Sequence, residues 1–328
     1  MARERKALRA GVLVILLAAV WRLASGGALE PVAEFFSEPS RAAFLVYLGT
    51  GRVVHPQAQA QRSPAPVVAT LPAETEPSPL SFGEDDAKYF SLYNYSGKSV
   101  DALALLQQPL SWQLTGNSPT VLILHTHATE SYTKNGENYE ETADFRTLNA
   151  DYNMLAVGRQ LARQLEDAGI GVIHDTTLHD DPSYTGSYNS ARKAVAAYLE
   201  EYPSISLVLD LHRDAALDAN GKQMATRATV EGAESAQLMI VVGTDGAGLS
   251  HPGWKENMAL ATKLHVTLQK RWEGIMRPIC FRAERFNQDL LPGMLLVEVG
   301  TAGNTQAQAL KATECLAWGI IQLAQGTK

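Results

Sequence analysis

The chain has little cysteine and no excess of positive charge. Its 328 residues include two cysteines, Cys280 and Cys315, and the formal net charge is −7. Two cysteines without a Cys-x-x-Cys pair exclude a cysteine-rich structural zinc site, and we expect two buried free thiols rather than a disulfide. Because no basic stripe is present to neutralise phosphates, no nucleic acid is expected as a partner, whereas a cell-wall polymer or a peptide is compatible with this charge.

The signatures of several enzyme classes are also missing. No Gly-x-Ser-x-Gly elbow, P-loop or Gly-x-Gly-x-x-Gly motif follows an apolar run, so serine hydrolase and nucleotide-binding functions lack support. The chain has no internal repeats. Its apolar fraction of 45% and charged fraction of 19% are ordinary for a globular protein, so a full hydrophobic core is expected.

The N-terminus has the layout of a signal anchor or a signal peptide. Basic residues within 3–9 precede an uncharged apolar run over 10–21. This run is shorter than the roughly 20 residues that span a bilayer, but 23–29 extend it beyond Arg22, whose long side chain reaches the interface. Small residues nearby offer a cleavage position, and anchoring is favoured over cleavage. We therefore expect a single-pass membrane segment over 1–29, with the following domain outside the cytoplasm.

The segment 30–85 is predicted to connect this anchor to a folded domain. Its first part, 31–48, contains several Phe and Leu residues and is compatible with a juxtamembrane helix. The part over 55–84 holds six of the 15 prolines, with much Ala, Gln, Ser and Glu. Such a composition buries too little apolar surface to form a core and is typical of an extended linker. The folded, catalytic domain is predicted over 86–328.

Apolar periodicity in this domain predicts strands that alternate with helices. A βαβ order of this kind predicts an α/β fold with a mostly parallel sheet, flanked by helices on both faces. The expected strands lie at 121–124, 171–175, 206–211, 237–243 and 295–299. One helix is expected within 144–168, and the others at 189–202, 254–272 and 305–324.

Three of the apolar strands deliver a histidine or a glutamate. His125 directly follows the run 121–124, His212 ends the run that begins at Leu207, and Glu298 lies between two valines. Chemistry in open α/β sheets collects at the carboxyl ends of strands, and a glutamate in an apolar run is costly to bury unless it is paired, protonated or close to a metal. Together these residues predict one catalytic metal site.

A catalytic zinc ion has three protein ligands and an open position for water. We expect His125, Glu130 and His212 to bind Zn²⁺ and Glu298 to act as the general base and then the general acid. His127 is an alternative to His125, because it lies two residues further along and points to the same face if the strand continues. The alternatives to Glu130 are three glutamates in the same loop, Glu137, Glu140 and Glu141.

Two other histidines, His174 and His179, lie among aspartates in a predicted loop. We expect them to be surface residues.

Five motifs in fixed order resemble the stage II sporulation protein P family. They begin at His125 (HTHATESY), Asp210 (DLHRDA), His251 (HPGWKEN), Arg285 (RFNQDL) and Leu296 (LVEVGT), and the match covers roughly residue 89 to the C-terminus. The resemblance implies a zinc-dependent peptidoglycan hydrolase of the N-acetylmuramoyl-L-alanine amidase type, with associated endopeptidase activity on peptide cross-links. It also implies action during engulfment in sporulation, at the septal membrane, with the sporulation proteins D and M as partners.

The same resemblance guides the site residues. In the wider amidase family a ligand Glu comes from the start of the helix after the first strand, but the corresponding region here, 149–152, has no Glu. The role therefore falls to Glu130. From their positions in the motifs, Arg213, Asn287 and Gln288 are expected to hold polar groups of the substrate. The alternative functions are a non-catalytic wall-binding scaffold and a zinc endopeptidase without amidase activity.

Overall fold

A computed structural model describes residues 80–110, 112, 114, 118–134, 145–219 and 222–326. The predicted membrane segment over 1–29 and most of the linker over 30–85 therefore lie outside the described residues. Nothing long and apolar enough to cross a bilayer occurs among the helices of the described part. The first described helix, η1, spans Glu84–Tyr89, across the boundary predicted between residues 85 and 86.

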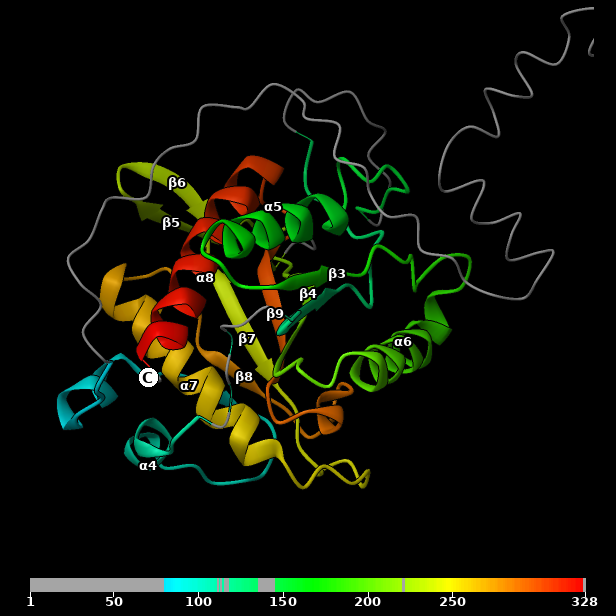
Figure 1. Cartoon of the computed structure of the whole chain (residues 1–328). Helices are drawn as coiled ribbons and strands as arrows, with labels where there is room; N and C mark the ends of the chain where they lie inside the picture. Colours follow the sequence, from blue (N-terminus) through cyan, green and yellow to red (C-terminus); the bar gives the residue numbers. More distant parts are fainter. Residues whose placement is uncertain are drawn as a thin grey trace, which may run out of the picture. The chain divides into compact units, whose positions relative to one another are not determined.

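The centre of the fold is a seven-stranded sheet, and Figure 1 shows helices on both of its faces. Every neighbouring pair of strands is parallel except β7 and β9, which are antiparallel, so the predicted α/β fold with a mostly parallel sheet is confirmed. In spatial order the strands are β1 (Leu92–Asn94), β8 (Ile279–Phe281), β7 (Leu238–Val242), β9 (Met294–Thr301), β4 (Leu207–Asp214), β2 (Val121–Leu124) and β3 (Val172–His174).

Three of the four long helices lie close to the predicted ranges, and the first lies within the predicted segment 144–168. Asn153 caps the first of them by accepting a hydrogen bond from the Leu155 amide, and the chain leaves that helix through Gly169, whose φ of +81° favours glycine. The helices of the described part are α4 (Ala102–Gln107), α5 (Met154–Asp167), α6 (Ser187–Glu201), α7 (Trp254–Arg271) and α8 (Gln306–Gly326), with short 3₁₀ turns η2 (Tyr184–Gly186) and η3 (Gln288–Leu290).

Four short strands were not predicted. Strands β1 and β8 have three residues each, and a two-stranded hairpin is formed by β5 (Arg227–Val230) and β6 (Ala233–Ala236). Runs this short carry too few residues for an alternating pattern to be recognised.

Alternating side chains on the strands separate two layers of core. On β2, Val121 and Ile123 pack in the larger cluster with α5, α7 and α8, whereas Leu122 and Leu124 pack in a second cluster with α6. We call the two sides the α5 face and the α6 face. This alternation decides the position of each polar residue that the strands carry, because neighbouring residues on a strand point to opposite faces.

The two cysteines are free thiols, as predicted. Cys315 is buried in the core on the α5 face, and burial raises its pKa to about 12. Cys280 on β8 is half-buried on the other face.

Candidate metal and catalytic site

His212 and Glu298 are neighbours on adjacent strands. The register of β4 and β9 pairs these two residues, and both point to the α6 face because the leucines and valines that alternate with them pack on the α5 face. His212 is 3% exposed. Two of the predicted site residues are thus held side by side by the most regular part of the fold.

The loop after β2 brings two further groups to His212. The chain turns at 126–129 instead of continuing the strand. Glu130 Oε2 then lies 3.5 Å from His212 Nδ1 and accepts a hydrogen bond of 3.3 Å from the Arg213 amide. The ring of His127 lies edge-on to the ring of His212, with 5.1 Å between the centroids. His127, Glu130, His212 and Glu298 therefore gather at one end of the α6 face.

His125 lies on the opposite side of the sheet. It continues the alternation of Val121 and Ile123, and its Nε2 is 2.9 Å from His174 Nε2, beneath α5. Gly158 of α5 leaves the space for this pair, because a Cβ there would lie 2.4 Å from His125 Nε2. The other ring nitrogen of His125, Nδ1, is 3.1 Å from the Leu211 carbonyl, to which it donates. The structure therefore brings His127, and not His125, to the other predicted site residues.

Asp210 of β4 attaches the loop after β2 to the sheet. Its carboxylate accepts hydrogen bonds from the Thr126 amide (2.7 Å) and the Thr126 hydroxyl (2.6 Å), and its Oδ1 lies 3.0 Å from His212 Nε2. Together with the contact from His125 to the Leu211 carbonyl, this attaches two consecutive residues of the loop to two consecutive residues of β4. The approach of the loop to His212 is thus fixed by several bonds.

Neighbouring charges decide the protonation of the buried site. Burial lowers the pKa of His212, but Asp210 and Glu130 more than offset this and hold the pKa well above its usual value. Burial raises the pKa of Glu298 to about 8, with Asp214 and Glu130 adding to the shift. Burial also opposes ionisation of Glu130, yet His212 keeps the pKa of that carboxyl below its usual value. Without a metal ion, the site thus combines an ionised Glu130 with a Glu298 that is largely protonated at neutral pH.

His127 carries no charge in this arrangement. Burial, reinforced by the nearby His212, lowers the pKa of His127 to about 4. A neutral imidazole is the form that binds a metal ion.

Two buried polar atoms of the site, His127 Nδ1 and Glu298 Oε2, have no hydrogen-bond partner. Buried polar atoms are normally paired, so unpaired ones that converge on one place point to a missing ligand. Two imidazoles and a carboxylate are also the donor types that zinc prefers. The residues fit a zinc ion in chemistry, although within the described ranges no three His, Cys, Asp or Glu side chains are arranged as a preformed metal cluster.

The three predicted substrate-binding residues are bonded within the protein. Arg213 is 5% exposed and donates to the carbonyls of Ser131 and Phe145. Asn287 donates to the Tyr188 carbonyl. Gln288, 1% exposed, accepts from the Gly243 amide and donates to the Val241 carbonyl. These side chains hold the loops around the site, and their polar atoms are occupied by protein partners.

The prediction that His174 and His179 are surface residues was wrong. His174 contacts His125 under α5, and burial, with a further effect of His125, lowers its pKa to about 3. His179 is 5% exposed and lies between Asp175 Oδ2 (3.1 Å) and Ser190 Oγ (2.9 Å). His174 is the last residue of β3, and His179 lies in the segment that follows. The surrounding sequence is rich in Asp and Thr, as in a solvated loop, and it carries no local signal that this segment packs against α6.

Two residues next to the site, Arg146 and Tyr184, were not predicted. Arg146 Nη1 lies 2.7 Å from Asp180 and its Nη2 3.4 Å from Glu130 Oε1, while its guanidinium lies over the ring of Tyr184 at 4.7 Å. Both residues lie in polar loops without any motif. The alternative ligands Glu137, Glu140 and Glu141 lie outside the described residues.

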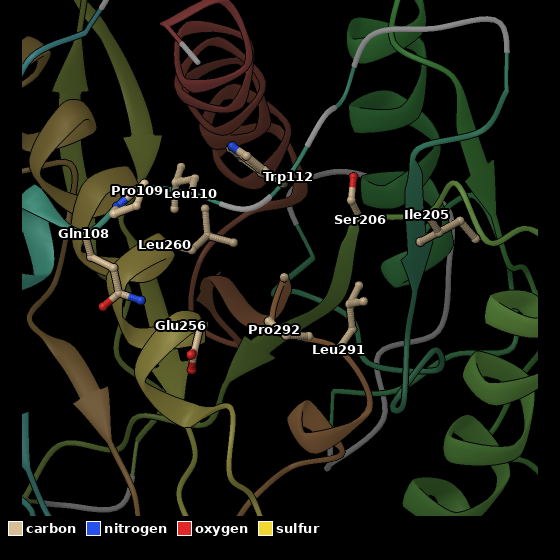
Figure 2. A pocket seen from close by; sticks show the side chains of 11 residues that line it. Gln108, Pro109, Leu110, Trp112, Ile205, Ser206, Glu256, Leu260, Leu291 and Pro292 are labelled. Carbon is tan, nitrogen blue, oxygen red and sulfur yellow. The ribbon is translucent and has the colours of Figure 1, made fainter. Parts of the chain in front are cut away.

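A separate cavity lies at the amino-terminal ends of β4 and β9, opposite to the candidate site. It has a volume of about 240 Å³ and is bordered by Ser206 and Gly293, which precede β4 and β9, and by Trp112, Leu260 and Leu291 (Figure 2). Its lining includes neither a histidine nor any of the predicted site residues. The candidate site is therefore defined by the convergence of polar side chains at the carboxyl ends of β2, β4 and β9, and not by this cavity.

Comparison with known proteins gives one extensive match. The family model described as stage II sporulation protein P (SpoIIP) matches residues 57–321. Stage II sporulation protein P of Bacillus subtilis (strain 168) is 27% identical over 261 residues, which are 75% of this chain and 61% of the relative. The chain thus spans less than two thirds of the length of that relative.

Some solved structures are similar over a smaller part of the chain. The N-acetylmuramoyl-L-alanine amidase from Clostridium difficile 630 is 17% identical with a TM-score of 0.35, and the similarity covers 63% of this chain and 95% of that one. The N-acetylmuramoyl-L-alanine amidase AmiC2 of Nostoc punctiforme is 15% identical with a TM-score of 0.36, and the similarity covers 64% of this chain and 99% of that one.

Proposed function

Because the chain belongs to the stage II sporulation protein P family, we propose that it is a zinc-dependent peptidoglycan hydrolase of the N-acetylmuramoyl-L-alanine amidase type. The observation that supports this most is the convergence of His127, Glu130 and His212 next to Glu298, with buried atoms that lack partners. A structural role alone does not account for two unpaired buried polar atoms, His127 Nδ1 and Glu298 Oε2, beside this set of ligand-type side chains.

We assign the metal ligands to His127, Glu130 and His212. His127 replaces the predicted His125, because His125 lies on the α5 face and is bonded to His174 and the Leu211 carbonyl. A zinc ion held there would polarise the scissile carbonyl and lower the pKa of a water molecule. Asp210, 3.0 Å from His212 Nε2, and Arg213, which donates to Glu130, would keep both ligand side chains in place.

Glu298 is the proposed general base and acid, and it would accept a proton in its ionised form, which a zinc ion held beside it would favour by lowering its pKa. Its Oε2 is buried without a partner, on the strand next to His212. In the proposed hydrolysis, a water oxygen forms a bond to the carbonyl carbon of the lactyl amide while its proton passes to a Glu298 oxygen. The carbon–nitrogen bond then breaks, and the same proton passes to the leaving nitrogen of L-alanine. The products are a free carboxylic acid on the muramic acid and a free stem peptide.

The proposed setting follows from the family. The substrate is peptidoglycan, the partners are the sporulation proteins D and M, and the site of action is the sporulation septum, reached through an anchor over 1–29. An associated activity on peptide cross-links belongs to the same proposal.

The test uses the full chain, its Glu298→Gln variant and Glu256→Gln as a matched control. Glu256 borders the cavity at the amino-terminal ends of β4 and β9, away from the candidate site. Bound zinc is quantified, and the products from purified peptidoglycan are identified by mass spectrometry. We expect zinc in all three proteins and free stem peptides from the wild type and the control.

Other outcomes of this experiment would contradict the proposal. Cleaved cross-links with an intact lactyl amide would indicate an endopeptidase. Zinc without products would indicate a scaffold, and the absence of both would refute the metal site.

A further inference from the structure

An exposed tyrosine stacks on the proposed ligand His127. The rings of Tyr184 and His127 are nearly parallel, at an interplanar angle of 16° and a centroid distance of 4.4 Å. Tyr184 is 56% exposed, whereas His127 beneath it is 6% exposed. An aromatic residue this exposed contributes little to the core, so its position over a site residue calls for an explanation.

The loop that carries Tyr184 is attached to the site loop. Asp180 accepts hydrogen bonds from the Thr129 hydroxyl (2.6 Å) and amide (3.2 Å) and pairs with Arg146 at 2.7 Å. Arg146 in turn lies over the Tyr184 ring, 4.7 Å from its centroid. The loop after β3 and the loop after β2 are therefore connected by hydrogen bonds and an ion pair. These contacts fix the position of the Tyr184 ring over His127.

A second set of contacts fixes the base of the same loop. Asp175 accepts hydrogen bonds from the Thr177 amide (3.0 Å) and hydroxyl (2.7 Å), and its other oxygen lies 3.1 Å from His179 Nε2. His179 Nδ1 is 2.9 Å from Ser190 Oγ on α6. The loop is thus hydrogen-bonded both to α6 and to the loop after β2, and these contacts restrict its movement relative to the site.

The orientation of the His127 ring depends on packing. A histidine ligand is usually oriented by a hydrogen bond from its second ring nitrogen. His127 Nδ1 has no such partner, and the ring is surrounded by Tyr184, by the edge of Tyr188 at 5.5 Å and by His212 at 5.1 Å. Because Tyr184 makes the one parallel contact of the three, it limits rotation of the ring out of its plane.

We propose that Tyr184 is a positioning residue, which holds the imidazole of His127 in the orientation required for binding Zn²⁺. The inference rests on the proposed function, since it assumes that His127 is a ligand. It adds a role for the loop after β3, which contributes no ligand. The stack on His127 takes the place of the hydrogen bond that orients most histidine ligands.

The experiment compares the full chain with three variants. Tyr184→Ala removes the stack, Tyr184→Phe keeps the ring without the hydroxyl, and Tyr95→Ala is a matched control. Tyr95 is likewise exposed, at 63%, with an arginine guanidinium over its ring at 5.8 Å, but it follows the edge strand β1. The measurement is the Zn²⁺ affinity by competition with a chromogenic chelator, together with the urea midpoint.

We expect Tyr184→Ala to bind Zn²⁺ about 10-fold more weakly, as for the loss of other groups that orient a ligand. Tyr184→Phe and Tyr95→Ala should stay within about twofold of the wild type, since the stack is kept in both. Should the alanine variant not fold, Tyr184→Leu supplies apolar bulk without a ring and should show the same loss.

An unchanged affinity in Tyr184→Ala would overturn the inference alone, as would an equal loss in Tyr184→Phe. A wild-type chain that binds no Zn²⁺ would overturn the proposed function and this inference with it. The two failures are therefore distinguishable in the same set of titrations.

Discussion

His125 and His127 are two residues apart, yet substitution of each should affect a different property. His125→Ala removes an imidazole that is completely buried, and it leaves His174 Nε2 and the Leu211 carbonyl without that partner. The loss of packing and of these bonds should lower the free energy of unfolding by about 3 kcal/mol. Its effect on Zn²⁺ affinity should stay within about 10-fold, because it acts only through the position of neighbouring residues.

His127→Ala should show the reverse pattern. The ring has an unpaired buried nitrogen and contributes mainly its aromatic contacts, so the apo protein should lose about 1 kcal/mol of stability. The Zn²⁺ affinity should fall by more than about 100-fold, because a direct ligand contributes more than a group that orients one.

Two measurements on the same preparations separate these effects. Urea unfolding in the presence of a chelator gives the stability of the apo protein, and titration against a chromogenic chelator gives the Zn²⁺ affinity. If His125→Ala abolished zinc binding while His127→Ala retained it, the assignment of the ligand from the two faces of the sheet would be refuted.

Three further predictions concern stability. Gly158→Ala should lower the free energy of unfolding, measured in urea, by about 1–2 kcal/mol, because the overlap of the added Cβ with the His125 ring outweighs the gain in helix propensity. An increase in the free energy of unfolding of about 1 kcal/mol would contradict this. Burial lowers the pKa of His265 to about 4, so the folded state binds fewer protons than the unfolded state and stability should fall as the pH drops from 6.5 to 4. His265→Gln should remove about 2 kcal/mol of this loss between pH 7 and 4.5, measured by urea unfolding, and an unchanged pH dependence would exclude His265 as its source. Saturating Zn²⁺ at about 1,000 times the dissociation constant should stabilise the wild type by about 4 kcal/mol in thermal unfolding, an effect that a chelator should remove. At the same Zn²⁺ concentration the stabilisation of His127→Ala should be at most about 1.4 kcal/mol.

The sequence by itself predicted most of the sheet and three residues of the candidate site, Glu130, His212 and Glu298. The apolar runs that end in His212 and surround Glu298 are long enough to define buried strands, and parallel strands of this kind bring their carboxyl ends together. The long amphipathic helices followed from the apolar periodicity, and five motifs in fixed order suggested the family.

Only the tertiary structure decided which histidine of the pair faces His212. Strand β2 ends at Leu124 and the chain turns at 126–129, so the alternation that placed His125 and His127 on one face no longer applies. The roles of His174, Arg146 and Tyr184 depend on contacts with residues that are distant in sequence or lie in separate loops. Such contacts leave no periodic signal along the chain, because they arise when loops fold back over a completed sheet, and local propensity carries no information about where a loop comes to lie.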